Sequence, residues 1–355
     1  MNMMAYNSSY DMMNSTASTL SLSSDYVYLY DDYEPCSTDT TITLGSNFLP
    51  VLFSLVFVVG LAGNSVVLLI LIKHIRLKNM TDVCLLNLAI SDLLFVLSLP
   101  FWAYYTSDHE IVSTALCKAI VGLYQIGFYS SVLFVTLMSI DRYLAIVHAV
   151  FAMRARTLCF GVVASIGIWT VAICGSIPAM AFNKVVAPES TTCQPEYPIG
   201  EEKIWKLIHN FEDNVLGLLI PLPIMMYCYV SILIVLLRSR NSKRHRAIKL
   251  IFMVVCVFVV FRLPYNVVVF MKSLQEFGIG DKCENAKRIE LALQLTETVA
   301  LIHCCVNPFI YAFVGEKFRK HMNHMFSRFS LCAYFCKQTS IHMKVSENET
   351  SNTPL

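Results

Sequence analysis

Seven long apolar runs dominate the sequence, and each is long enough to cross the hydrocarbon core of a membrane as a helix. A crossing takes about 20 helical residues, and such a run satisfies its own backbone hydrogen bonds in lipid only as a helix. The composition agrees, because 56% of the 355 residues are apolar and 15% are charged, against roughly half and a quarter in soluble domains. We therefore predict an all-α membrane protein, a seven-transmembrane helix bundle. The predicted spans are 47–72, 83–105, 115–147, 158–182, 215–237, 250–271 and 289–314.

The basic residues beside the spans predict the side of the membrane on which each loop lies. Lys and Arg concentrate after the first, third, fifth and seventh spans, and loops with this excess stay in the cytoplasm. Residues 1–46 instead contain six acidic residues and no Lys or Arg, so this tail is expected outside. It does not resemble a cleavable signal peptide, and the first span is expected to direct export. The sequence predicts a multi-pass plasma-membrane protein with an extracellular N-terminus and a cytoplasmic C-terminus.

Four parts are expected along the chain. Residues 1–46 form a mostly disordered acidic tail, 47–314 the transmembrane domain, and 330–355 a disordered cytoplasmic tail. Residues 315–329 carry large apolar side chains at helical spacing, which predicts a short amphipathic eighth helix on the membrane surface. Cys332 and Cys336 follow it and are candidate palmitoylation sites that would anchor the chain to membrane lipids. The alternative is a pair of unmodified thiols.

The predicted topology sorts cysteines and glycosylation acceptors by compartment. Disulfides persist outside the cell, and four cysteines on that side permit three pairings, which the residues alone leave open. These cysteines are Cys36, Cys117, Cys193 and Cys283. Two N-x-Ser/Thr acceptors for glycosylation lie in the same compartment. They are Asn7 and Asn14.

Enzyme and nucleic-acid signatures are missing from the sequence. It contains no Walker-type glycine loop, zinc-ligand spacing or G-x-S-x-G motif. The formal net charge of +2 does not suggest a polyanionic partner. No catalytic residue, no bound cofactor and no nucleic-acid partner are therefore expected.

Polar residues inside the spans are costly in lipid, and here their order identifies a family. The set comprises Gly63-Asn64, Leu88-Ala89-Ile90-Ser91-Asp92, Asp141-Arg142-Tyr143, Trp169, Pro221, Tyr229, Pro264 and Asn307-Pro308-Phe309-Ile310-Tyr311. Together these residues resemble the rhodopsin-like, class A G-protein-coupled receptors. The longer strings LLNLAISDLLF, SIDRYLAIVHAVFA, HCCVNP and FIYAFVGEKFRK are similar to the CC-type chemokine receptors. They do not distinguish a vertebrate receptor from one captured by a virus.

The resemblance implies how the extracellular side works. Chemokines are small, mostly basic proteins, and an acidic tail raises their local concentration by Coulomb attraction. The resemblance implies tyrosine sulfation in that tail, and the alternative is unmodified tyrosines. The candidates are Tyr26, Tyr28, Tyr30 and Tyr33. It also implies two disulfides, Cys117–Cys193 and Cys36–Cys283.

The family's ligand pocket maps onto aromatic residues around one carboxylate. By resemblance the pocket consists of Trp102, Tyr105, Tyr124, Tyr265 and Glu297. It would receive the flexible N-terminus of a chemokine, whose amine Glu297 could pair. The alternative is that the aromatic rings only pack between helices.

Two further sets are implied by resemblance. A sodium-binding cluster, which would make sodium an allosteric ligand, corresponds to Asn64, Asp92, Ser131 and Asn307, and oxygen ligands around one carboxylate suit a hard cation. The coupling and switch residues are Asp141, Arg142, Tyr143, Tyr229, Pro264, Asn307, Pro308 and Tyr311. Asp141 would hold Arg142 in the inactive state. Once the sixth span swings out, Arg142 with Tyr229 and Tyr311 would line the cleft for the G protein.

Arg262 is the main departure from the family pattern. Most of these receptors have Trp two residues before the span-six proline, Pro264. An arginine at mid-membrane depth costs several kcal/mol unless it is paired or hydrated, and the candidate partners are Asp92 and Glu297. We hypothesise that Arg262 pairs with Asp92, directly or through water, and takes the electrostatic role of sodium. The alternatives are that Arg262 impairs switching, or that it is an allele or a sequence error.

The resemblance implies a cell-surface receptor for CC chemokines that activates a heterotrimeric G protein of the inhibitory class, mobilises calcium and guides chemotaxis. The alternative is a scavenging or decoy receptor that internalises chemokine with weak signalling. The intact Asp141-Arg142-Tyr143 motif favours the first, and Arg262 favours the second. A transporter would need charged or broken-helix sites repeated between halves, which the sequence does not show. Phosphorylation of the C-terminal Ser and Thr residues would recruit arrestin.

Overall fold

The computed structural model describes residues 39–73, 77–105, 113–148, 150, 152, 156–186, 192–238, 244–279 and 283–314. The α-helices are α1 (Asp39–Lys73), α2 (Met80–Tyr105), α3 (Thr114–Val147), α5 (Leu158–Phe182), α6 (Glu202–Asn214), α7 (Pro221–Arg238), α8 (Arg244–Glu276), α9 (Cys283–Leu301) and α10 (His303–Val314). A π-helical turn, Val215–Leu219, joins α6 to α7. Two short strands, β1 (Asn183–Val186) and β2 (Thr192–Pro195), form a hairpin.

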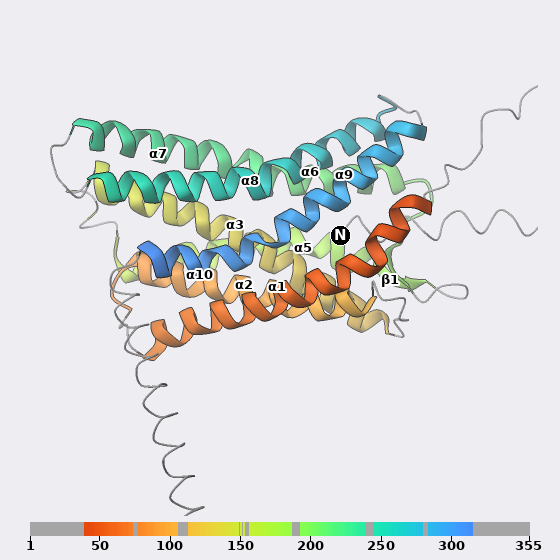
Figure 1. The fold of residues 1–355 in the computed structure, drawn as a ribbon, viewed down its shortest axis with the longest axis horizontal. Coiled ribbons are helices and arrows are strands. Elements are labelled where there is room, and N and C mark those ends of the chain that lie inside the picture. Colours follow the sequence, from red (N-terminus) through yellow and green to blue (C-terminus); the bar gives the residue numbers. More distant parts are fainter. Residues whose placement is uncertain are drawn as a thin grey trace, which may run out of the picture.

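The predicted seven-helix bundle is confirmed. Among the described residues, seven helical stretches are long and apolar enough to cross a membrane. They lie side by side along one axis, with the β hairpin at one end, which we call the hairpin end (Figure 1). The chain is therefore a multi-pass membrane protein.

The fifth span begins earlier than its apolar run predicted. Its helix starts at Glu202, 13 residues before the π-helical turn. This extension, α6, mixes polar and apolar side chains such as Lys206, Ile208 and His209, so a search for continuous apolar sequence does not detect it. The extension matters because it brings polar residues into the bundle that the sequence analysis left in a loop.

Helix α3 is the centre of the bundle, and it crosses obliquely between the other helices (Figure 1). It packs against α2, α5 and α7, and its Tyr129 and Phe134 are among the largest fully buried side chains. At Gly127 the backbones of α3 and α2 nearly touch, because a Cβ atom there would lie 2.6 Å from the backbone N of Phe95. Small residues allow this close approach of helices in membranes.

Large apolar side chains cover the outside of the bundle. Val163 and Ile166 on α5 and Phe270 on α8 are more than half exposed. In a soluble protein such a surface would promote aggregation, whereas lipid tails are as apolar as these side chains. The exposed faces are therefore the lipid-contacting faces.

A disulfide ties the hairpin to the bundle. Cys193 on β2 is bonded to Cys117 near the start of α3, and in the hairpin it lies opposite Val185. This confirms the first predicted disulfide and fixes the hairpin over the end of α3. Cys36 lies outside the described residues, so its pairing with Cys283 stays a prediction.

Two irregular turns interrupt the spans. The π-helical turn is closed by a hydrogen bond from the N–H of Ile220 to the carbonyl of Val215, 3.0 Å long. Between α9 and α10 the chain turns at Ile302, whose N–H donates to Val299. Turns of this kind are frequent at functional sites, and both lie near the polar clusters described below.

Candidate functional site

Aromatic rings from α2 and α3 meet an acid from α9 toward the hairpin end. Trp102 packs edge-on against Tyr105 and Tyr124, with ring centroids 6.1 and 6.4 Å apart. The hydroxyl of Tyr124 donates a 3.2 Å hydrogen bond to Oε1 of Glu297. Glu297 is only 6% exposed, and the phenol supplies a donor that offsets part of the cost of burying its carboxylate. Four of the predicted ligand-pocket residues therefore form one cluster.

Tyr265, the remaining predicted pocket residue, joins this cluster through Phe128. The Phe128 ring stacks on Tyr124 at 6.4 Å and meets Tyr265 edge-on at 6.3 Å. The hydroxyl of Tyr265 does not point to Glu297, however. It donates to Oδ2 of Asp213 at 3.3 Å, so a second buried acid lies on the α6 side of the pocket.

Asp213 is the functional candidate that the sequence analysis missed. It is 4% exposed, and its Oδ1 accepts hydrogen bonds from Tyr129 at 2.6 Å and Gln125 at 3.0 Å. Nε2 of His209 lies 3.9 Å from its Oδ2. The signal was present in the sequence, because His209 and Asp213 are spaced i, i+4 as on one helix face. It was overlooked because the helix was predicted to begin after both.

Arg262 on α8 is buried against an aromatic ring. Its side chain is 4% exposed, and its guanidinium carbon lies 4.2 Å from the centre of the Phe128 ring, within the range of cation–π attraction. Its Nε has no hydrogen-bond partner among the described residues. Among the described residues, no direct hydrogen bond or ion pair joins Arg262 to Asp92, whose carboxylate oxygens accept hydrogen bonds from other side chains; a pairing through water stays a prediction.

Those bonds come from the predicted sodium cluster. The hydroxyl of Ser131 donates to Oδ1 of Asp92 at 2.7 Å, and Nδ2 of Asn307 donates to Oδ2 at 2.8 Å. Asn64 does not bind Asp92 directly, and instead donates to the carbonyl of Cys304 at 3.1 Å. All four side chains are buried. The Asp92 carboxylate and the Ser131 hydroxyl are oxygen ligands of the kind that a hard cation prefers, whereas Asn307 presents its amide nitrogen to Asp92 in this conformation.

At the opposite end of the bundle, Asp141 has a different partner from the one expected. Both of its carboxylate oxygens bind the guanidinium of Arg156, at 2.7 and 3.1 Å. Thr81 on α2 donates a further 2.6 Å bond. Arg142 is exposed, because adjacent residues on a helix do not share a face. In this conformation Arg156, not Arg142, neutralises Asp141.

Two tyrosines of the coupling set, Tyr229 and Tyr143, have partners near the same end, whereas the two prolines lie inside their helices. Ser139 donates a 2.9 Å hydrogen bond to the Tyr229 hydroxyl, and Tyr143 contacts Tyr227 through their hydroxyls at 3.4 Å. Pro264 lies inside α8 and is exposed. Pro308 lies inside α10. Its ring packs closely against α1, because a Cβ atom added to Gly63 would lie 3.0 Å from the Pro308 ring.

Several predicted sites lie outside the described residues. They are the tyrosines Tyr26, Tyr28, Tyr30 and Tyr33, the acceptors Asn7 and Asn14, the eighth helix 315–329, and Cys332 and Cys336. The side chain of Tyr311 is also outside the described part. These sites stay predictions.

Comparison with known proteins agrees with this geometry. The family model of the 7 transmembrane receptor (rhodopsin family) matches residues 63–311. C-C chemokine receptor type 4 of Homo sapiens is 49% identical over 320 residues, which cover 88% of this chain and 88% of that receptor. C-C chemokine receptor type 1 of Homo sapiens is 46% identical over 301 residues, which cover 84% of this chain and 85% of that receptor. Both relatives are receptors rather than enzymes. The chain therefore belongs to the rhodopsin family of seven-transmembrane receptors and, within it, to the C-C chemokine receptors.

Proposed function

We propose that this protein is a plasma-membrane receptor for a CC chemokine, with the hairpin end outside the cell and the Arg142 end in the cytoplasm. The observation that carries the proposal is the Glu297 carboxylate, buried among Trp102, Tyr105 and Tyr124 and bonded to Tyr124. A buried acid within aromatic walls suits a cation, and the N-terminal amine of a chemokine is one. The acidic residues of the N-terminal tail would attract the same basic protein from solution.

Signalling is proposed to run through the opposite end of the bundle. Arg142 is exposed at the end of α3, where it can receive the C-terminal helix of a heterotrimeric G protein of the inhibitory class. Asp141 is already neutralised by Arg156, so Arg142 does not have to leave it before a G protein binds. Calcium mobilisation and chemotaxis would follow from that coupling. Phosphorylation of the C-terminal tail would recruit arrestin.

Arg262 supports a second candidate function. Its guanidinium lies on Phe128 at the position where most of these receptors have the tryptophan that moves on activation. A charge fixed there would hinder that movement and leave a receptor that binds and internalises chemokine but signals weakly.

One pair of measurements separates the two functions. A panel of chemokines is tested for binding to cells that express the receptor, and each binder is then tested for G-protein nucleotide exchange and for uptake of labelled chemokine. Exchange together with uptake supports the signalling receptor, and uptake alone supports the scavenger. Glu297→Gln should weaken binding at least tenfold, because it removes the charge that pairs with the amine. A panel without any binder would contradict both functions.

A further inference from the structure

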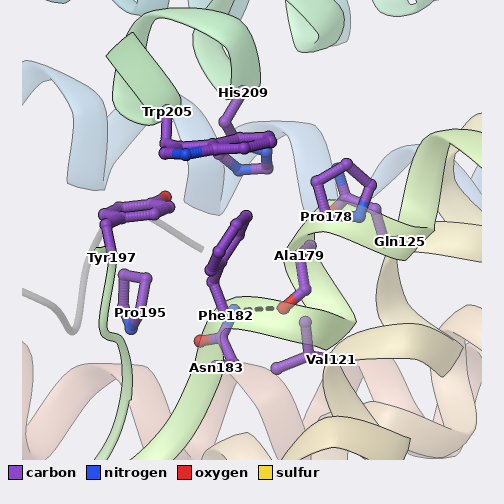
Figure 2. Close-up of a pocket in the computed structure, with 10 residues that line it drawn as sticks. All are labelled: Val121, Gln125, Pro178, Ala179, Phe182, Asn183, Pro195, Tyr197, Trp205 and His209. Atoms are coloured by element: carbon purple, nitrogen blue, oxygen red, sulfur yellow. Dashed lines mark hydrogen bonds between the residues drawn. The ribbon is translucent and has the colours of Figure 1, made fainter. Parts of the chain in front are cut away.

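A recess lies beside the ligand cluster, between α3, α5, β2 and α6. Three aromatic rings line it, from Phe182, Tyr197 and Trp205, together with the polar side chains of Gln125 and His209. Figure 2 shows Trp205 over Phe182, with Tyr197 on one side and Gln125 on the other. None of the predicted ligand residues lines this recess.

The aromatic wall is held in a fixed arrangement. Phe182 tilts against Trp205 and Tyr197, with ring centroids 4.6 and 5.2 Å apart. The indole Nε1 of Trp205 donates a 3.0 Å hydrogen bond to Glu201, which orients the ring. Aromatic faces carry negative charge density, and walls built from several such rings bind ammonium and guanidinium groups.

An acid lies directly behind the polar side of the recess. Gln125 donates its amide hydrogen to Asp213, and His209 lies against the other oxygen of that carboxylate. Tyr197, on the opposite wall, has its pKa raised to about 12 by burial and, to a smaller extent, by the charge of Asp213. All residues that line the recess are described, and none of them is Lys or Arg. His209 is the only lining residue that can carry a positive charge, and the Asp213 carboxylate lies behind it and Gln125.

Helix α3 separates this recess from the Glu297 site. Tyr124 and Gln125 are consecutive, so their side chains point about 100° apart around the helix. Tyr124 bonds Glu297 on α9, and Gln125 bonds Asp213 on α6. The two neighbouring side chains thus reach two different acids on two sides of the bundle.

We propose that the recess is a second cation subsite, which takes an arginine or lysine side chain of the basic protein ligand. The charged group lies against the aromatic rings that line the recess, and it donates to Oε1 of Gln125, whose Nε2 is already committed to Asp213. The proposal rests on the proposed function and adds a second point of attachment to it. Glu297 holds one positive group of the ligand, and the Asp213 side of α3 holds another.

The three tryptophans of the chain allow a site-resolved test. The full-length receptor is labelled with 5-fluorotryptophan and purified in detergent micelles, and its ¹⁹F spectrum is recorded. Trp205 reports on the recess and Trp102 on the Glu297 cluster, and Trp205→Leu assigns the first signal. The probe is Nα-acetyl-arginine amide, and the control is its neutral isostere Nα-acetyl-citrulline amide.

The arginine probe should shift the Trp205 signal in a saturable manner, and the citrulline compound should not. Asp213→Asn should weaken this response about tenfold, because it removes the charge behind the recess. His209→Gln, which keeps Asp213, should weaken it less. Phe211→Leu is the matched control on the same helix, because Phe211 is 66% exposed on the lipid face, and it should leave the response unchanged.

Three results would overturn the proposal. They are a Trp205 signal that the arginine probe does not move, an equal response to the citrulline compound, and an unchanged response in an Asp213→Asn variant whose melting curve shows that it is folded. Because the probe is not a chemokine, these results count against the recess alone. A chemokine panel without a binder would count against the receptor function alone.

Discussion

Replacing Arg262 with methionine tests whether the buried guanidinium costs the receptor stability. Methionine is unbranched and flexible enough to fill much of the same space. The charge of an arginine at the centre of a membrane helix costs about 2.5–3.5 kcal/mol. Its contact with Phe128, 4.2 Å from the ring centre, offsets at most about 2 kcal/mol. The variant should therefore be more stable than the wild type by about 1 kcal/mol, which corresponds to a rise in melting midpoint of about 2 °C.

The assay follows thermal unfolding in detergent micelles with a thiol-reactive fluorescent dye. Four cysteines, Cys84, Cys228, Cys304 and Cys305, are buried and not in disulfides, so they react when the bundle opens. Arg238→Met is the control, because Arg238 is exposed at the end of α7 and its loss should change little.

A second part of the assay concerns sodium. Without Arg262, Asp92 lacks a nearby positive charge, so sodium should raise the melting midpoint of Arg262→Met more than that of the wild type. Choline chloride at equal ionic strength is the comparison salt. The reasoning is refuted if Arg262→Met melts below the wild type, or if sodium stabilises both proteins equally.

Three further predictions follow from the packing and the charges. Gly127→Ala should destabilise the receptor by about 1–3 kcal/mol, because the new Cβ atom meets the backbone of α2. The control in the same melting assay is Gly167→Ala, which has open space around it. Equal melting midpoints for the two variants would contradict the close approach of α3 and α2. Arg156→Gln should lower the free energy of unfolding by about 1–2 kcal/mol, because it leaves buried Asp141 without its ion pair. The effect is reduced because the Arg156 side chain is 25% exposed. Arg156→Lys should recover part of the lost stability, and an unchanged stability in Arg156→Gln would count against the ion pair. Tyr197 should titrate near pH 12 instead of pH 10. Its contribution to stability is therefore complete below pH 10 and is lost as the pH rises toward 12. The ultraviolet difference titration of wild type minus Tyr197→Phe measures the titration midpoint of Tyr197, and a midpoint near pH 10 would disprove the raised pKa.

The sequence alone was sufficient for the transmembrane architecture. Apolar runs near 20 residues leave one stable form in lipid, so the seven spans could be predicted without any knowledge of their packing. The Cys117–Cys193 disulfide followed from resemblance, and the structure contains it. The resemblance also predicts Trp102, Tyr105, Tyr124 and Glu297 as neighbours, and their rings and carboxylate form one cluster in the structure.

The partners of polar side chains were harder to predict. Asp141 and Arg142 are adjacent in sequence, yet Arg156, which lies in another segment, reaches the carboxylate. Arg262 was expected to pair with Asp92 directly or through water, but the direct partners of that acid are Ser131 and Asn307. Several donors lie at a similar depth in the bundle, and which of them reaches an acid depends on helix rotation and on tertiary packing. Neither is contained in the spacing of residues along the chain.

The π-helical turn at Val215–Leu219 has a consequence for any attempt to transplant the Asp213 site. A turn with i, i+5 bonding contains one residue more than an α-helical turn, and one residue rotates everything before it by about 100°. A graft that copied Asp213 and His209 onto a regular helix would point the carboxylate in the wrong direction. Deleting a single residue from the turn would do the same in this protein, without altering any side chain that binds the acid.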